Sequence, residues 1–422
     1  FEKAKKMILI ALDGIMKIGD KSFSKYANVF LLISEINGAL NKDDETINLF
    51  NDLLENRFNE NIFFLLSNIN PKLLDKRIID KAEYHLLTNE NNYKNKIERF
   101  NYVTPLYFGL AMCYQSRDKE KSEEYFDSGN KEILNSTRYN SHQYQERIVK
   151  TMELYLKKYK SFDEADRDHG KKNFFIVGSP RSGTTLLESI VTANDKVFSG
   201  GELKSGKDII ERNVLSQRQS LSELNHKFIS KYLRRTSYLR GSYDYIVDKM
   251  PENFLYLGLI QKLLPKSKII RVFRNPWDTA ISLYKQRYVM NVPYSVSFFN
   301  IGVFLANFEA INLFWDEHIE KKNFILDVKY EDLVSNYSLN QEKIYKFLEI
   351  DTLYDEKKRN EFFSPTASIR QVKEGIHQKS IEKKDFSHHK SEFNDALLMQ
   401  REYWSQKGIS TKSNEFFGYL LN

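Results

Sequence analysis

The chain has 422 residues, of which 41% are hydrophobic and 29% are charged, and it carries a formal net charge of +7. This is the composition of a globular protein, and the length predicts two domains. The single cysteine, Cys113, excludes an intrachain disulfide, so nothing requires an oxidising compartment and we expect a cytoplasmic protein. The modest positive charge suits an anionic ligand or an acidic partner, although solvated lysines would give the same figure.

We expect no membrane span and no nucleic-acid partner. No apolar run approaches the roughly 20 residues that a membrane helix needs. The most apolar early stretch, "MILIALDGIMKIG" (7–19), is interrupted by Asp13 and Lys17.

Residues 1–160 predict an all-α region. Apolar residues recur there at helical spacing, for example along "ERIVKTMELYLKKYK" (146–160). The stretch from 107 to 131 predicts a pair of helices and resembles a tetratricopeptide unit, whose period is about 34 residues. A second clear copy is hard to find, so an ordinary helical bundle stays open as the alternative.

After a polar linker over 161–172, the region 173–422 has the pattern of an α/β domain. Short apolar runs, each followed by helical sequence, predict parallel strands joined by helical crossovers. These runs are "NFFIVG" (173–178), "DYIVDK" (244–249), "SKIIRVF" (267–273) and "NFILDV" (323–328). Such sheets bind ligands at the carboxyl ends of their strands, so we expect the functional site at that edge.

The segment "GSPRSGTT" (178–185) follows the first predicted strand and opens a helix. It fits the phosphate-loop pattern, except that Thr184 stands where the lysine that reaches the outer phosphates is expected. Two glycines allow a tight turn with inward N–H groups, and the start of the helix adds its positive end. Without the lysine, the loop suits a sulfuryl group that needs no metal. The predicted anion-binding residues are Ser179, Arg181, Ser182, Gly183, Thr184 and Thr185.

Three motifs together carry a family resemblance. "FFIVGSPRSGTTLLESIV" (174–191) looks like the 5′-phosphosulfate loop of the sulfotransferases that use 3′-phosphoadenosine-5′-phosphosulfate (PAPS), and "RVFRNPWDTAISLYKQ" (271–286) looks like their 3′-phosphate motif. "VKYEDLV" (328–334) is similar to a further recurrent element. The resemblance is strongest to bacterial tetratricopeptide-repeat sulfotransferases and to tyrosylprotein sulfotransferases. It implies a P-loop-like α/β sulfotransferase fold preceded by the helical region, with PAPS as sulfuryl donor and no metal.

The second motif predicts the 3′-phosphate pocket. Arg274 follows an apolar strand-like run, so we expect its side chain in the crevice at the carboxyl end of that strand. Ser282 lies one helical turn beyond Asp278. An arginine and a hydroxyl suit a phosphate, and this pocket would distinguish PAPS from ATP, whose ribose has a free 3′-hydroxyl.

Other nucleotide contacts rest on the resemblance. Tyr330 packs either beside the adenosine or in the core, and both interpretations stay open. The basic stretch 364–386 resembles the segment that closes over the nucleotide, with Ser368 and Lys383 at the spacing of the family. Gly375 stands where many relatives have proline, which weakens this match.

Carboxylates are better candidates for the catalytic base than histidines, most of which lie outside the strand–loop regions. Glu202, in "FSGGELKSG" (198–206), resembles the glutamate base of tyrosylprotein sulfotransferases; by itself it would be an exposed loop acid. Lys249 matches the family lysine near the leaving-group oxygen and would act with Arg181 on the developing charge. Lys204 replaces an arginine of the relatives, so a bidentate contact is lost there.

These residues predict in-line transfer of a sulfuryl group from PAPS to a hydroxyl, with Glu202 as the base. A protein tyrosine, a carbohydrate and a small hydroxylated metabolite stay open as acceptors, since helical repeats serve peptide binding and also homodimer formation. One alternative is an atypical P-loop NTPase or kinase, in which Asp248 would help to hold Mg²⁺. Another is a non-catalytic helical scaffold with a relic nucleotide fold.

Overall fold

The computed structural model describes residues 27–39, 42–56, 58–88, 93, 95–137, 139–161, 169–216, 221–288, 292–351, 381 and 385–409, together with Lys6. The chain forms two compact units. The first comprises Phe1–Tyr139 and Tyr284–Ser297, and the second comprises Asn140–Leu283 and Phe298–Asn422. The expected boundaries at 160 and 172 stay predictions.

The first unit is helical. Its core is apolar and includes Phe50, Phe63, Leu66, Val103 and Leu110, all at most 1% exposed. The described elements are α2 (Ala27–Ala39), α3 (Asp43–Asn56), α4 (Glu60–Ile69), η2 (Pro71–Leu73), α5 (Lys76–Thr88), α6 (Lys96–Tyr114), α7 (Lys119–Ser136) and η6 (Pro293–Val296). Helices α6 and α7 confirm the predicted helix pair, whereas its tetratricopeptide character stays a prediction.

The segment 284–297 belongs to this first unit although it follows the predicted 3′-phosphate motif along the chain. The backbone carbonyl of Tyr284 accepts a hydrogen bond from Asn130 at 2.9 Å, and Arg287 Nε donates to Thr104 Oγ1 at 3.0 Å. Burial lowers the pKa of Arg287 to about 10, although Glu60 acts in the opposite direction. Polar side chains of the helices therefore fix this segment within the helical unit.

The second unit is built on a five-stranded parallel sheet with the order β2-β3-β1-β4-β5. Its strands are β1 (Asn173–Gly178), β2 (Val197–Ser199), β3 (Tyr245–Asp248), β4 (Lys268–Phe273) and β5 (Ile325–Lys329). Four of them confirm the predicted apolar runs. The sequence did not predict β2, which has only three residues and precedes two glycines.

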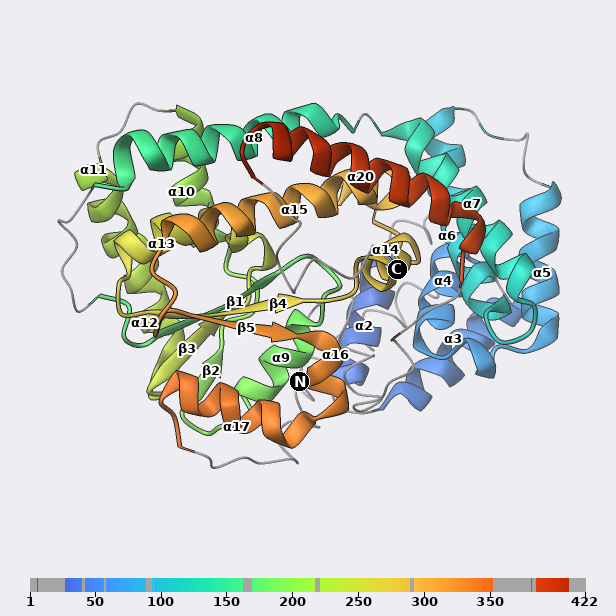
Figure 1. Ribbon diagram of the computed structural model, residues 1–422. Coiled ribbons are helices and arrows are strands. Elements are labelled where there is room, and N and C mark those ends of the chain that lie inside the picture. Colours follow the sequence, from blue (N-terminus) through green and yellow to red (C-terminus); the bar gives the residue numbers. More distant parts are fainter. Residues whose placement is uncertain are drawn as a thin grey trace. The chain divides into compact units, whose positions relative to one another are not determined.

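Helices cover both faces of this sheet, as the α/β fold class requires. Figure 1 shows α15 and α20 on one face and α9 and α17 on the other. The described helices are α8 (Ser141–Leu154), η3 (Tyr155–Tyr159), α9 (Thr184–Val191), α10 (Lys204–Ser216), α11 (Leu221–Lys227), η4 (Phe228–Leu233), α12 (Arg234–Arg240), η5 (Pro251–Tyr256), α13 (Leu257–Leu263), α14 (Pro276–Tyr284), α15 (Phe298–His318), α16 (Tyr330–Ser335), α17 (Tyr337–Leu348), η8 (Ser387–His389) and α20 (Lys390–Gln406). The predicted parallel sheet flanked by helices is thus confirmed.

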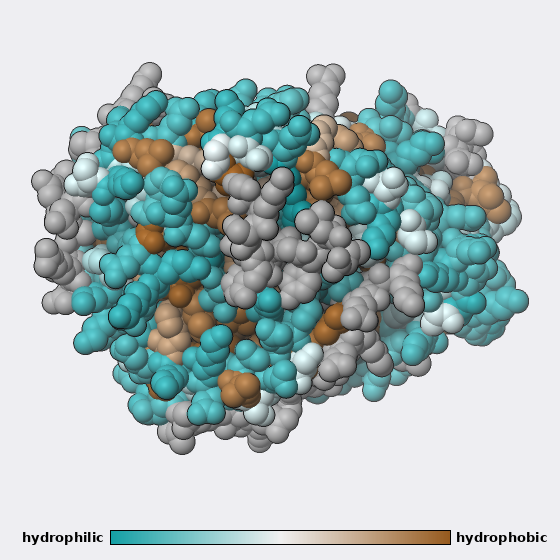
Figure 2. Space-filling model, viewed as in Figure 1, coloured by the Kyte–Doolittle hydropathy of each residue, from teal (hydrophilic) through white to brown (hydrophobic). Residues whose placement is uncertain are grey.

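Helix α15 is long and apolar enough to cross a membrane, although no apolar run of that length was expected from the sequence. Most of its apolar window, 83%, is buried inside the protein, as in a core helix. The described surface in Figure 2 is mostly hydrophilic, with hydrophobic residues in small separate areas. The apolar character of α15 is therefore explained by packing within the second unit.

Candidate active site

All the sequence-predicted site residues that the structure describes lie at the carboxyl edge of the sheet. The parallel register pairs Gly178 with Val272 and Phe273 with Lys329, so β1, β4 and β5 end close to one another. Because β1 lies between β3 and β4, the strand order reverses beside it. In open α/β sheets ligands bind at this kind of reversal, and the loop after β1 occupies it.

The loop from Gly178 to Thr185 has the geometry of an anion-binding turn. Gly183 has φ +104°, and a Cβ there would lie 2.3 Å from Tyr330 Cδ2. Arg181 also has a positive φ, 69°, which is strained for a side chain larger than glycine. Ser182 is fully buried, and its Oγ has no hydrogen-bond partner among the described residues. The loop thus holds a buried donor in a close-packed turn, as an anion-binding cradle requires.

Arg181 connects the loop to both residues of the predicted 3′-phosphate motif. Its Nε donates to Ser282 Oγ at 3.0 Å, and its backbone carbonyl accepts from Arg274 Nη1 at 2.8 Å. Arg181 is 6% exposed and Ser282 is 4% exposed. These contacts hold Arg181 in its strained conformation and bring two arginines and a hydroxyl together.

Tyr330, the first residue of α16, packs against this region. The Arg274 guanidinium carbon lies 4.5 Å from the centroid of the Tyr330 ring, and burial lowers the pKa of Arg274. The neighbouring Glu331 accepts a hydrogen bond from the backbone N–H of Asn275 at 2.8 Å. Helix α16 therefore fixes the backbone immediately after Arg274. We call residues 178–185 with Arg274, Ser282 and Tyr330 the loop–arginine cluster.

A second group of residues forms at the ends of β2 and β3. Lys249 Nζ donates to Glu202 Oε1 at 2.7 Å; the lysine side chain is 1% exposed and the glutamate side chain is 44% exposed. Backbone hydrogen bonds fix this pair, because Gly200 N–H donates to the Val247 carbonyl and Lys249 N–H donates to the Gly201 carbonyl, both at 2.9 Å. The predicted base and the predicted leaving-group lysine are thus direct neighbours.

Glu188 completes this group, and sequence reasoning missed it. It lies on α9, is 0% exposed and accepts a hydrogen bond from Ser199 Oγ at 2.7 Å. Its Oε2 is 3.9 Å from Lys249 Nζ. A glutamate within the otherwise apolar stretch "TLLESIV" (185–191) was the available signal, because a fully buried carboxylate needs partners.

Asp248, at the end of β3, is the last member of the second group. It is 1% exposed, and Tyr232 O–H donates to its Oδ2 at 2.7 Å. Burial raises the pKa of Asp248 to about 7; the hydrogen bonds from Tyr232 and from the backbone of Leu203 and Met250 act in the opposite direction, and the charge of Glu188 adds to the rise. We call Glu188, Glu202, Asp248 and Lys249 the lysine–carboxylate cluster.

The remaining predicted residues divide into three groups. Ser179, Thr184 and Thr185 are buried within the loop. Lys204 is exposed at the first position of α10. Ser368 and Lys383 lie outside the described residues, so their assignment to the nucleotide stays a prediction.

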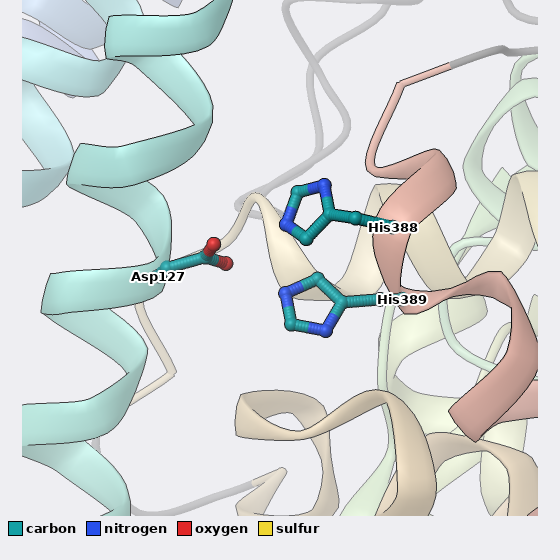
Figure 3. A group of neighbouring side chains, drawn as sticks. All are labelled: Asp127, His388 and His389. Carbon is teal, nitrogen blue, oxygen red and sulfur yellow. The ribbon is translucent and has the colours of Figure 1, made fainter.

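The histidine pair of η8 takes no part in either cluster. Figure 3 shows the side chains of His388 and His389, whose ring centroids lie 4.2 Å apart. His389 also stacks on Phe298, with ring centroids 4.9 Å apart. Asp127, drawn in the same view, is on α7 of the first unit, where it accepts a hydrogen bond from Tyr284 O–H at 2.7 Å. We assign these histidines to packing and keep carboxylates as the candidates for the base.

Residues 172–356 match the model of the sulfotransferase family. This region contains the three motifs that carry the resemblance, so the match shows that residues 172–356 are similar to that family. The sulfotransferase domain of the Synechococcus PCC 7002 olefin synthase is a structural neighbour with 19% identity and a TM-score of 0.39, covering 57% of this chain and 98% of that domain.

Two relatives match at the level of sequence. An uncharacterized protein of Aquifex aeolicus (strain VF5) is 27% identical over 289 residues, which are 63% of this chain and 37% of that protein. A Caenorhabditis briggsae protein, provisionally named a protein-tyrosine sulfotransferase, is 25% identical over 195 residues, 42% of this chain and 65% of that protein. The matches span less than two thirds of either relative.

Proposed function

We propose that the second unit transfers a sulfuryl group from PAPS to a hydroxyl acceptor, with Glu202 as the base. The observation that carries this proposal is the position of Arg181. It joins the loop after β1 to Ser282 and Arg274, the two residues of the 3′-phosphate motif, through contacts of 3.0 and 2.8 Å. A donor with phosphates at both the 5′ and the 3′ positions needs these two sites side by side.

The residues of the loop–arginine cluster suit such a nucleotide. Loop N–H groups, Ser182 and Arg181 would hold the 5′-phosphosulfate, and Arg274 and Ser282 would hold the 3′-phosphate. The buried Ser182 Oγ, which has no partner among the described residues, supports this assignment. Tyr330 and the predicted contacts of Ser368 and Lys383 would then border the nucleotide.

The lysine–carboxylate cluster suits the transfer step. The acceptor O–H gives its proton to Glu202 while its oxygen forms a bond to sulfur. In line with that bond, the bond from sulfur to the 5′-phosphate oxygen breaks, and its electron pair stays on the phosphate. Lys249 and Arg181 stabilise the charge that develops there. Glu202 then passes its proton to water.

The acceptor is proposed as a class, a hydroxyl group of a peptide or a carbohydrate. The half-exposed Glu202 gives a large acceptor access to the base. The provisional name of the C. briggsae relative favours a protein tyrosine. A phenol, whose pKa is about 10, loses its proton to a carboxylate only in concert with attack on sulfur, which in-line geometry allows.

The NTPase alternative has less support from the same residues. Thr184 is buried at 5% exposure in the position of the phosphate-loop lysine. Asp248, the candidate metal ligand of that alternative, is 1% exposed and already accepts a hydrogen bond from Tyr232 O–H at 2.7 Å.

A thermal-melting experiment with 3′-phosphoadenosine-5′-phosphate (PAP) tests the proposal, with ATP in the presence and absence of Mg²⁺ as the comparison. PAP at about 100 times its Kd should stabilise the protein by roughly 2.7 kcal/mol, independently of metal. A shift with Mg·ATP and none with PAP would reject PAPS as the donor and support the NTPase alternative.

A further inference from the structure

Lys249 occupies a position that is costly for a cation. Its side chain is 1% exposed, and a charge that is taken out of water costs free energy unless it is paired. Two carboxylates offset this cost, since Glu202 Oε1 lies at 2.7 Å and Glu188 Oε2 at 3.9 Å from Nζ. The two differ in exposure, because Glu188 is 0% and Glu202 is 44% exposed.

The reaction proposed above would disturb one of these two ion pairs. When Glu202 takes the acceptor proton it becomes neutral, and Lys249 loses the charge of its nearer partner. This happens at the moment when the leaving phosphate needs a positive charge beside it. A second carboxylate that takes no part in proton transfer would keep the ammonium ion charged through this step.

Glu188 has the placement for this purpose. Its carboxylate is held by Ser199 Oγ at 2.7 Å, and α9 and β2 that carry the two residues are both part of the packed sheet unit. It is fully buried, so bulk water and the acceptor do not reach it. We propose that Glu188 is a positioning residue, which keeps Lys249 charged and in place when Glu202 is neutralised; this rests on the proposed function.

The other acidic side chains near Lys249 are bound to partners of their own. Asp248 on β3 accepts from Tyr232 of η4 at 2.7 Å. Glu252 on η5 is paired with Lys207 of α10. Among the described residues, the ion pairs of Lys249 within 4.0 Å go to Glu188 and Glu202.

The test uses Glu202→Gln as a mimic of the protonated base, because glutamine is neutral and has the same shape. The Kd of PAP is measured by calorimetry between pH 6.5 and 9.5 for the full chain, for Glu202→Gln and for Glu188→Gln/Glu202→Gln. No acceptor is needed. We expect a level profile for Glu202→Gln, because Glu188 still keeps Lys249 charged.

At pH 6.5 we expect Glu188→Gln/Glu202→Gln to bind PAP about as tightly as Glu202→Gln does. At pH 9 the double variant should bind PAP about tenfold more weakly, because loss of a charged neighbour shifts a pKa by about one to three units. Adding Lys249→Arg should remove this pH dependence, because arginine does not lose its proton in this range. If the Kd of PAP changes with pH in the same way for Glu202→Gln and for Glu188→Gln/Glu202→Gln, the proposed role of Glu188 is overturned. Absence of PAP binding by the unmodified chain would instead overturn the proposed function, and this inference with it.

Two further variants separate positioning from loss of stability. Glu309→Gln removes another buried carboxylate, which pairs with Arg401 at 2.7 Å between α15 and α20. In the Glu202→Gln background it should lower the melting temperature and leave the pH profile of PAP binding unchanged. If the double variant does not fold, Ser199→Ala/Glu202→Gln replaces it, and a profile identical to that of Glu202→Gln would count against the proposal.

Discussion

The two clusters at the carboxyl edge of the sheet handle charge in different ways. In the loop–arginine cluster, Arg181 Nε donates to the Ser282 hydroxyl and Arg274 Nη1 donates to a backbone carbonyl, and both of these acceptors are neutral groups. In the lysine–carboxylate cluster, Lys249 is paired with Glu202 and Glu188. The first arrangement suits tight binding of an anion, and the second suits movement of a proton.

This difference follows from what each cluster has to do. A binding site gains from cations whose charge is offset by the ligand itself. A reacting site needs a base and a cation together, and the pairing of Lys249 with Glu202 offsets the cost of burying the lysine while the glutamate stays accessible to an acceptor. We therefore expect variants in the first cluster to change nucleotide affinity and variants in the second to change the rate of transfer.

The largest effect should come from Glu202→Gln. Loss of a general base lowers kcat by about 10²- to 10⁴-fold. PAP affinity near neutral pH should stay within a few-fold, because the loop–arginine cluster is intact. Steady-state kinetics with PAPS and a tyrosine-containing peptide or a carbohydrate, together with calorimetry of PAP, would measure both. Transfer at the unmodified rate would remove Glu202 from the mechanism.

Arg274→Ala should have the next largest effect, and it should weaken nucleotide binding where Glu202→Gln slows transfer. It removes a charged donor from the 3′-phosphate, worth about 1.5–3 kcal/mol, so PAP affinity should fall by about 10- to 100-fold. Affinity for adenosine-5′-phosphosulfate, which has no 3′-phosphate, should change much less. Equal losses for the two nucleotides would mean that Arg274 only supports the loop.

Gly183→Ala tests whether the shape of the loop is required. A side chain at φ +104° and 2.3 Å from Tyr330 should lower the free energy of unfolding by about 1–3 kcal/mol and weaken PAP binding. Gly201→Ala is the matched control, since Gly201 has φ +62° but open space around its Cβ position. In chemical denaturation, Gly201→Ala should lower the free energy of unfolding less than Gly183→Ala does. The reverse order would contradict the close packing of Gly183 against Tyr330.

The last prediction concerns Asp248 and the dependence of protein stability on pH. Its pKa is about 7 in the folded protein and about 3.9 in an unfolded chain, so the folded state binds more protons between these values. This contribution to stability is present below about pH 4 and is lost as the pH rises through 7, at up to about 1.4 kcal/mol per pH unit. Asp248→Asn should reduce the change in the free energy of unfolding with pH, measured by denaturation from pH 4 to 8. If this pH dependence is unchanged in the variant, other groups cause it.

Much of the site could be predicted because its signals are local. The apolar run before Gly178 and the helix after Thr184 define a strand–loop–helix, and Arg274 directly follows a second buried run. In these cases, a few consecutive residues decide the backbone conformation, and the strand end decides where the side chain points. The short strand β2 gave too little pattern to predict, since its three residues are followed by Gly200 and Gly201.

By itself, the sequence determined the parallel α/β sheet, the loop after β1 and the position of Arg274, because hydrophobic runs, glycines and helix starts act over a few residues. Only the tertiary structure decided which distant groups meet. Glu188, Glu202 and Lys249 come from α9, the turn after β2 and the end of β3, and they become neighbours only through the pairing of β2 and β3 beside β1. Because Lys249 is buried at the end of β3, it needs a charged partner, and the glutamate in "TLLESIV" signals a buried carboxylate without showing which cation it meets.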